Sequence, residues 1–347
     1  MNFLFDIGHP AHVHLLRNFA ARMKNTGHQI LFTSRNKPLN IRLLKEFSLP
    51  FISIGNVKTG FWQKIAGLFY FNKELYKVAR RYKPDVFLSH GSIYAAHVSS
   101  LLGKPHISFE DTGNKEQVML YKPFTDAILV SDSFTHNYGH KMVVYPGYHE
   151  LAYLHPNQFR PDPGVLRQYN LDPKDNLIII RFVKRNATHD FRHPGIPEEK
   201  KIELVEQFSE NNKVLITSEA GLPKQLLPYQ IKINPADIFH IMAFSKLVFG
   251  ESATMASEAA VLGVPAIFID STSRDYTHEQ EVKYGLVFNY SESPQDIDEA
   301  IRTGLKILSD PANQKQFQQK RQILLQEKID VTAFLCEFVE DFIKKRS

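Results

Sequence analysis

The sequence predicts an α/β protein made of two doubly wound, Rossmann-like domains whose parallel sheets face each other across a cleft. Short β-rich runs alternate with helical patterns, which is typical of parallel sheets with right-handed crossovers. The alternation stops in a Pro- and Tyr-rich stretch at 145–163, which reads as a linker, and then restarts. With 347 residues, 43% of them hydrophobic, the chain is long enough to bury two cores.

The N-terminal domain is expected over residues 1–163, with the linker included. Helical segments lie between several of its strands, so the strands are expected to run parallel. Ligands bind at the carboxyl ends of such strands, and the functional residues are therefore expected in the loops that follow them. Seven runs are typical of strands: 2–7, 29–33, 50–54, 85–89, 105–109, 126–130 and 141–145.

The C-terminal domain is expected over residues 164–347. Its helical patterns cover 197–209, 237–244, 254–262, 294–308 and a longer final stretch at about 311–345. The predicted strands are 177–182, 213–217, 230–233, 246–249, 265–269 and 285–288.

Residues 247–269 hold the most informative pattern of the chain. An apolar run leads into a Gly-Glu-Ser-Ala-Thr turn, a small-residue helix with Glu258, then Gly-Val-Pro and a second apolar run. Small turn residues let a diphosphate approach the backbone N–H groups at a helix start, and Glu258 can accept hydrogen bonds from ribose hydroxyls. The pattern favours a nucleotide-binding turn. The alternative is that Ser252 and Thr254 only cap the helix.

This stretch resembles the nucleotide-sugar segment of GT-B enzymes. In UDP-GlcNAc 2-epimerases and in the transferase that adds N-acetylglucosamine to the lipid-linked peptidoglycan precursor, a turn, an acidic residue and Leu-Gly-x-Pro follow in the same order. The resemblance implies a GT-B fold, a nucleotide-sugar substrate and a last helix that crosses back to the N-terminal domain. It places the donor contacts at Glu251, Ser252, Ala253, Thr254 and Glu258.

A string of three histidines, Gly-His-Pro-Ala-His-Val-His, follows the first strand at residues 8–14. It resembles the first loop of the peptidoglycan transferase, and it also resembles the opening of an uncharacterised archaeal and bacterial family of GT-B fold. Gly8 and His9 are predicted to contact substrate, and His12 to act as general base on an acceptor hydroxyl, because imidazole titrates near neutrality. The alternative is a capping or packing role. The spacing does not match a standard metal site, so no metal is expected.

The segment from His90 to Glu116 resembles an epimerase segment in which an Asp and two Glu work with a His. Glu110 matches the first Glu, but Ser92 stands where the Asp is expected, and a serine cannot act as a carboxylate acid or base. This departure places epimerase second among the hypotheses. Glu110 and Asp111 are predicted to face the cleft as the alternative acceptor base. Helix capping or a loop ion pair is the other interpretation.

Two further groups are predicted to contact the donor. Arg181, near the end of the first strand of the second domain, would neutralise charge on the leaving UDP in place of a metal, although a solvated basic loop is the alternative. The segment 273–281 corresponds to the sugar-binding loop of GT-B transferases. It offers Asp275, His278, Glu279 and Gln280.

The charge distribution indicates an anionic partner for the first half of the chain. Residues 1–163 contain 19 Lys and Arg against 11 Asp and Glu, whereas the remainder contains 23 against 26. A glycan or a lipid-linked acceptor fits this asymmetry, and no nucleic-acid motif is present. The aromatic and basic stretch 58–83 is compatible with peripheral association with the inner face of the cell membrane, but a core-facing amphipathic helix is the favoured interpretation.

The single cysteine and the lack of a signal-like or spanning run predict a cytoplasmic protein. The leading hypothesis is a glycosyltransferase with a UDP-sugar donor, metal-independent and without a cofactor, in cell-surface polysaccharide or glycolipid assembly. Inversion is expected because Glu251 and Glu258 are seven positions apart, whereas many retaining GT-B enzymes have two glutamates eight apart. The alternatives are a UDP-GlcNAc 2-epimerase-like enzyme and a nucleotide-sugar-binding protein without catalysis.

Overall fold

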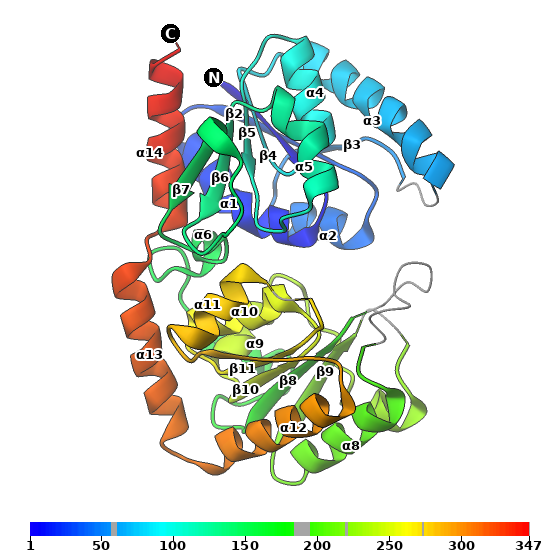
Figure 1. Ribbon diagram of the computed structural model, residues 1–347, viewed down its shortest axis with the longest axis vertical. Coiled ribbons are helices and arrows are strands. Elements are labelled where there is room, and N and C mark those ends of the chain that lie inside the picture. The colour runs from blue at the N-terminus through cyan, green and yellow to red at the C-terminus, as the bar shows by residue number, and fades with distance from the viewer. Residues whose placement is uncertain (57–60, 184–194, 219–220, 273, 347) are drawn as a thin grey trace. The chain divides into compact units, whose positions relative to one another are not determined.

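The chain divides into two compact units, each an α/β structure around one parallel sheet (Figure 1). Unit 1 contains Met1–Tyr153 and Ile329–Ser347, and unit 2 contains Leu154–Lys328. The division therefore falls at residues 153 and 328, whereas the sequence expectation placed it at 163. The computed structural model describes five stretches of the chain: 1–56, 61–183, 195–218, 221–272 and 274–346.

Unit 1 is built on a seven-stranded sheet in which every pairing is parallel and the strand order is β3-β2-β1-β4-β5-β6-β7. All seven strands predicted for this half are confirmed, each within one residue at its ends. They are β1 Asn2–Ile7, β2 Gln29–Ser34, β3 Phe51–Ser53, β4 Val86–His90, β5 His106–Phe109, β6 Ala127–Ser131 and β7 Met142–Tyr145.

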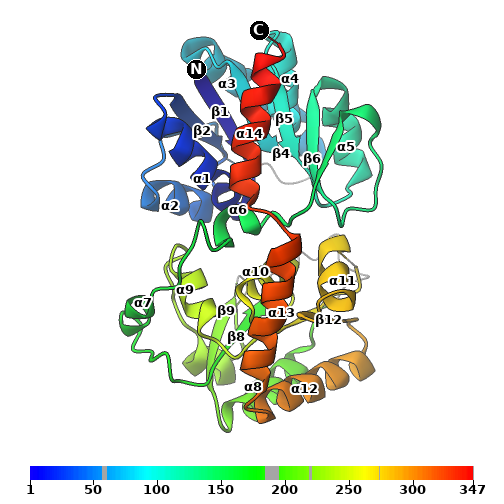
Figure 2. The same ribbon diagram turned by 90° about the vertical axis from the view of Figure 1, so that its left-hand side faces the viewer.

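Helices cover both faces of this sheet. The C-terminal helix α14 lies beside α1 on one face, and α3, α4 and α5 lie on the other (Figure 2). Buried phenylalanines fill the core, and the rings of Phe5 and Phe32 stack at 4.6 Å. Each such ring contributes roughly 1.5–3 kcal/mol by leaving water. The helices are α1 Pro10–Asn25, α2 Pro38–Glu46, α3 Phe61–Tyr82, α4 Ile93–Leu101, α5 Lys115–Tyr121, the single turn α6 Leu151–Leu154 and α14 Val331–Lys344, with 3-10 turns at Lys122–Phe124 and Gly139–Lys141.

Helix α3 turns one face toward the core, as the favoured interpretation of this stretch expects. Phe71, Leu75 and Ala79 recur every four residues and are all buried, which is the spacing of one helix face. Phe69 and Tyr70 are exposed on the same helix. Among the helices that the structure describes, none has the length and apolar character needed to cross a lipid bilayer.

Unit 2 is built on a five-stranded parallel sheet with the order β12-β11-β10-β8-β9. Helices α9, α10 and α11 lie on one side of it, and α8 and α12 on the other (Figure 1). Its strands are β8 Leu177–Phe182, β9 Lys213–Ser218, β10 Leu247–Gly250, β11 Ala266–Ile269 and β12 Val287–Tyr290. Its helices are α7 Pro163–Arg167, α8 Glu198–Ser209, α9 Ile238–Ala243, α10 Ala253–Leu262, α11 Asp275–Val282, α12 Pro294–Ser309 and α13 Asn313–Glu327, with a 3-10 helix at Lys224–Tyr229.

One predicted strand of this half, 230–233, is wrong. Only Gln230 bridges to the sheet, opposite Ile216, and the residues after it are irregular. The run lies between Pro228 and Pro235, and proline lacks the N–H that a longer ladder needs.

The final helical stretch, expected over 311–345, is two helices. Lys328 ends α13 in an extended conformation, and Asp330 then caps α14 by accepting the N–H of Ala333 at 3.0 Å. The break coincides with the return of the chain to unit 1.

The stretch expected to be a linker, 145–163, is partly core. Tyr148, Leu151 and Tyr153 are all almost fully buried, because their apolar side chains pack in unit 1 rather than extend into solvent.

Candidate functional site

The strand order of the first sheet reverses between β1 and β4, and the loops after these two strands hold several predicted residues. Open α/β sheets bind ligands at such a switch point, beyond the carboxyl ends of the strands. Gly8 and His12 lie in and just beyond the β1–α1 turn, and His90 is the last residue of β4. The predicted acceptor residues of this turn therefore lie where the topology favours a site.

His12 is held by its own turn. Its Nδ1 accepts the backbone N–H of Gly8 at 3.2 Å, and its ring stacks on that of His90 with centroids 4.5 Å apart. Burial, followed by the neighbouring His90, holds the pKa of His12 well below its usual value. A neutral ring that accepts at Nδ1 has its proton on Nε2, so in this conformation His12 offers ligands an N–H rather than a lone pair.

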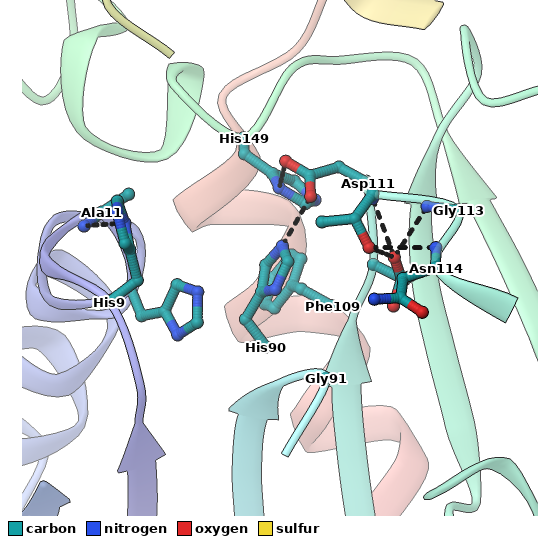
Figure 3. Close-up of polar contacts among 12 residues, drawn as sticks. His9, Ala11, His90, Gly91, Phe109, Asp111, Gly113, Asn114 and His149 are labelled. Carbon is teal, nitrogen blue, oxygen red and sulfur yellow. Dashed lines mark hydrogen bonds and ion pairs between the residues drawn. The ribbon is translucent and has the colours of Figure 1, made fainter. Parts of the chain in front are cut away.

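His90, Asp111 and His149 form a compact group, called here the histidine–aspartate cluster (Figure 3). Asp111 Oδ1 lies 3.0 Å from His90 Nε2, and Asp111 Oδ2 lies 3.2 Å from His149 Nδ1. The His90 and His149 side chains are 10% and 9% exposed, whereas that of Asp111 is 26% exposed. One carboxylate thus joins two enclosed imidazoles and remains partly open to solvent.

Within this cluster, the Asp111 carboxylate and the His90 imidazole shift each other's pKa values toward the charged forms. Burial alone would raise the pKa of Asp111, but His90 and His149 hold it well below the usual range. Burial lowers the pKa of His90, yet the Asp111 carboxylate, with a smaller contribution from Glu110, outweighs burial and raises it. Both shifts favour the charged forms of Asp111 and His90.

Glu110, the neighbour of Asp111, is fully engaged within its own loop. Its Oε1 accepts from Thr112 N at 2.8 Å, Thr112 Oγ1 at 2.6 Å and Gly113 N at 3.1 Å, and its Oε2 accepts from Tyr121 Oη at 2.6 Å. The residue is 1% exposed. Four donors leave this carboxylate little capacity for a substrate, and its evident effect is to order the loop that presents Asp111.

Ser92, at the position of the expected epimerase Asp, is the N-cap of α4. Its Oγ accepts from Ala95 N at 3.1 Å and donates to Asp6 Oδ2 at 2.6 Å. Asp6 is buried on β1, and burial raises its pKa. Sequence reasoning passed over Asp6, although it is the only charged residue of the apolar strand β1, which was a usable signal.

The remaining residues of the 8–14 string do not converge on one point. His9 is exposed and caps α1 by accepting the N–H of Ala11, as the capping alternative expects. His14 is buried on α1, with its ring 5.3 Å from that of Tyr153.

Gly8 allows the close approach of a cation. A Cβ atom at this position would lie 2.3 Å from Arg35 Nη2, and Lys37 Nζ donates to the Gly8 carbonyl at 2.7 Å. Two cationic side chains therefore border the β1–α1 turn, which agrees with the basic character of this half of the chain.

The second sheet reverses between β8 and β10, and the predicted nucleotide turn follows β10 at that point. Gly250 ends β10 with φ +149°, and a Cβ there would lie 2.1 Å from the carbonyl oxygen of Arg181 on β8. Ser252 caps α10 by accepting the N–H of Met255 at 3.3 Å, and Gly263 ends the helix with φ +76°. The capping role of Ser252 is therefore confirmed.

The cap leaves donors open at the start of α10. Among the residues that the structure describes, the N–H groups of Ala253 and Thr254 have no recorded hydrogen bond, whereas Met255 and Ala256 donate to Ser252. Both open residues are partly exposed. Glu258, by contrast, is only 5% exposed.

The carboxylate of Glu251 binds backbone N–H groups and so has a structural role. Its Oε2 accepts from Val183 N at 3.0 Å and its Oε1 accepts from Ile196 N at 2.9 Å, so one carboxylate holds together the residues that follow β8 and precede α8. Glu292 accepts from Gly195 N at 3.0 Å beside it. Arg181 lies on β8, partly buried.

The four residues predicted to bind the sugar differ in their burial and in their side-chain partners. Glu279 pairs with the fully buried Lys328 at 3.0 Å, and Gln280 donates to Ser257 Oγ at 2.7 Å from a fully buried position. Asp275 is the first residue of α11 and is partly exposed, and His278 is exposed. Asp275 and His278 are therefore the accessible members of the set.

Sequence reasoning gave no role to His90 or His149. His90 ends a strand at the switch point, which was a usable signal. His149 follows β7 within the stretch interpreted as a linker, and only the folded chain brings its Nδ1 to Asp111.

Comparisons with known proteins agree with this architecture. A protein-family model described as "Protein of unknown function (DUF354)" matches residues 1–342. No curated protein matches the sequence.

Several solved structures share the fold. The UDP-GlcNAc 2-epimerase from Neisseria meningitidis bound to UDP-GlcNAc is 14% identical, with a TM-score of 0.72 over 99% of this chain and 100% of that one. The UDP-GlcNAc 2-epimerase from Methanocaldococcus jannaschii is 14% identical, with a TM-score of 0.66 over 99% and 100%. The glycosyltransferase VinC in complex with dTDP is 12% identical, with a TM-score of 0.65 over 100% of both chains. The predicted fold class, two Rossmann-like domains of the GT-B type, is confirmed.

Proposed function

The chain belongs to the DUF354 family, and we propose that it is an enzyme that uses a nucleotide sugar. The specific proposal is a glycosyltransferase with a UDP-sugar donor that acts in the assembly of cell-surface polysaccharide or glycolipid. The observation that carries it is the β10–α10 turn, where small residues and two open N–H groups lie at the switch point of the second sheet.

Three features of the β10–α10 turn favour the binding of a diphosphate: open N–H groups, the helix dipole and small side chains. The N–H groups of Ala253 and Thr254 have no recorded hydrogen bond among the described residues, and the dipole of α10 favours an anion at that end. The side chains of this first turn are small enough for close approach. Arg181 lies on the neighbouring strand, and we propose that it neutralises the leaving diphosphate without a metal at the donor.

Glu258 and the start of α11 complete the proposed donor site. Glu258 would accept the ribose hydroxyls. Asp275 and His278 would contact the sugar, because their side chains are at least partly exposed, whereas Gln280 is fully buried. The reaction we favour is direct displacement at the anomeric carbon with inversion.

The acceptor is proposed to bind unit 1. Arg35 and Lys37 border the β1–α1 turn, so an anionic glycan or a lipid-linked acceptor finds positive charge there. His12 offers an N–H at the same turn. Such an acceptor would place the protein at the inner face of the cell membrane, with the exposed Phe69 and Tyr70 of α3 as candidate contacts.

A 2-epimerase is the second candidate, because two of the similar structures are UDP-GlcNAc 2-epimerases. Two observations favour the transferase. Ser92 supplies a helix cap where that family has a carboxylate, and Glu110 is occupied by four donors. Incubation with UDP-GlcNAc alone separates the two candidates. Formation of UDP-ManNAc would favour the epimerase, whereas UDP release that depends on an added acceptor would favour the transferase.

Ligand-dependent melting tests the donor site. UDP, GDP, CMP, dTDP and their sugars are compared, and UDP compounds are expected to raise the melting temperature by mass action. Ala253→Pro removes one N–H at the first position of α10, where proline is tolerated and where Ser252 already has the extended conformation that precedes proline. It is expected to lower the UDP shift by at least half, and Glu258→Gln to reduce it further.

Lys115→Pro is the matched control, because it changes the first position of α5 in the other unit. An unchanged UDP response in both Ala253→Pro and Glu258→Gln, with apo melting preserved, would remove this turn from the donor site. A response to no nucleotide at all would contradict the proposed function itself.

A further inference from the structure

We propose that the histidine–aspartate cluster, His90, Asp111 and His149, binds a divalent first-row transition-metal ion. Zn²⁺ is the probe that tests it. The proposal does not rest on the donor site, because all three ligands belong to unit 1 whereas the nucleotide turn belongs to unit 2.

The spacing of the ligand atoms fits a coordination sphere. One nitrogen or oxygen atom from each residue lies within 4.8 Å of the other two, and the two contacts through Asp111 measure 3.0 and 3.2 Å. In a tetrahedral zinc site with bonds of about 2.0–2.1 Å, neighbouring ligand atoms are about 3.3 Å apart. The two hydrogen bonds use different oxygens of Asp111, so metal binding requires the carboxylate to turn and the two imidazole nitrogens, which lie within 4.8 Å of each other, to approach about 3.3 Å.

The donor set selects the class of metal. Two imidazole nitrogens and one carboxylate suit Zn²⁺, Co²⁺ or Fe²⁺, whereas Mg²⁺ and Ca²⁺ prefer oxygen alone. Three protein ligands leave at least one coordination position for water, a hydroxyl or a phosphate oxygen, which is the arrangement of reactive rather than purely structural zinc sites. The partial exposure of Asp111 gives such a ligand access.

The loop that carries Asp111 is ordered by the neighbouring Glu110. Glu110 is 1% exposed and accepts four hydrogen bonds from its own loop and from Tyr121, which fixes the backbone that carries Asp111.

The imidazole rings of His90 and His149 are held by contacts with neighbouring aromatic rings. The ring centroid of His149 lies 5.2 Å from that of Phe109, in an edge-to-face arrangement, and 6.3 Å from that of Tyr145, with the planes 24° apart. The ring of His12 stacks on that of His90. Rings held in this way lose little freedom when they bind a metal.

Among the described residues, the side chain of His149 has no hydrogen-bond partner outside the cluster. Its Nδ1 contacts only another proposed ligand, Asp111, and its buried Nε2 has no hydrogen-bond partner among the described residues. The buried His106 shows the contrasting case, since its two ring nitrogens bond to the hydroxyls of Ser89 and Thr125 at 2.9 Å. His106 is explained by packing, whereas His149 is not.

The test is zinc binding to the full chain after removal of metals with a chelator. ZnCl₂ is titrated in competition with a chromophoric chelator, and CoCl₂ is added in parallel to record the visible spectrum. One equivalent of Zn²⁺ is expected to bind tightly, and Co²⁺ is expected to give the spectrum of a nitrogen- and oxygen-coordinated ion.

Asp111→Asn and His149→Gln are each expected to weaken zinc binding by at least tenfold and to abolish the cobalt spectrum. His140→Gln is the matched control, because it removes an exposed imidazole outside the cluster and should change neither. Melting of each variant in chelator checks that the fold persists, and a variant that fails this check is replaced by His90→Gln.

Two results would overturn the proposal: no stoichiometric zinc binding by the wild type, or binding that Asp111→Asn and His149→Gln leave unchanged. The second result would place the ion on others of the 15 histidines. The UDP melting experiment is performed in chelator, so a UDP shift without zinc binding contradicts only the metal, and zinc binding without a UDP shift contradicts only the donor site.

Discussion

Gly250 is the position at which the second sheet has no room for a side chain. Its φ of +149° is unfavourable for other residues, and a Cβ would lie 2.1 Å from the carbonyl oxygen of Arg181 and 2.9 Å from its nitrogen. The glycine therefore brings the nucleotide turn close to β8, and its role is geometric rather than chemical.

Gly250→Ala is predicted to destabilise the protein by at least about 2 kcal/mol, because the backbone of Arg181 must move to admit the methyl group. Urea unfolding measures the change. Gly221→Ala is the control, since a Cβ there meets no atom of the described residues within 4 Å, and it should be nearly neutral. Equal midpoints for the two variants would show that the strand contact is not tight.

Glu110 and Asp111 illustrate how adjacent carboxylates acquire different tasks. The first is enclosed by four donors, and the second contacts two imidazoles and is partly exposed. The sequence placed both at the carboxyl end of a strand but could not rank them, because the ranking depends on which way the loop turns after Phe109.

His106 makes stability depend on pH. It is fully buried, and burial lowers its pKa to about 3, only partly offset by Asp126. In the unfolded chain the pKa is about 6.5. The unfolded state therefore takes up a proton as the pH falls below about 6.5 while the folded state does not, and stability is lost from there down to about pH 3.

Acidification from pH 7 to pH 5 is predicted to cost about 2 kcal/mol through His106 alone. His106→Asn removes this group, so the variant should lose less stability than the wild type over the same interval. Urea unfolding at the two pH values gives the comparison. Parallel losses in both proteins would mean that His106 is protonated in the folded state.

At the scale of single elements, α10 depends on its cap. Ser252 Oγ satisfies the N–H of Met255, and the free N–H groups before it are those proposed for the diphosphate. The capping and nucleotide interpretations of this turn are therefore compatible, since they use different N–H groups.

Ser252→Ala is predicted to destabilise the protein by about 1 kcal/mol, because the Met255 N–H loses its acceptor. Ser252→Asn should restore most of this loss, since asparagine is an equally good cap. The melting temperatures of the three proteins give the test. A neutral Ser252→Ala variant would show that water replaces the cap at no cost.

The break within the final helical stretch was the feature of the elements least predictable from the sequence. The helical pattern at 311–345 has only one local sign of its interruption, the capping residue Asp330, and an aspartate alone does not mark a break. The strands other than 230–233 were predicted closely, since short apolar runs bounded by turn residues are typical of strands.

At the scale of the whole molecule, the sequence predicted two parallel α/β domains and the two turns that lie at their switch points. It did not predict which side chains meet there. Glu251 bonds to residues 55 and 68 positions away, and His149 reaches Asp111 from a stretch expected to be a linker. Such pairings follow from the tertiary fold, which no local pattern encodes.

The central claim is that the β10–α10 turn binds the diphosphate of a UDP-sugar. A crystal structure of the protein with UDP tests it most directly. The account predicts the diphosphate on the N–H groups of Ala253 and Thr254, with the ribose at Glu258. Density for UDP elsewhere, for example at the β1–α1 turn, or a turn closed by side chains with no UDP bound, would contradict it.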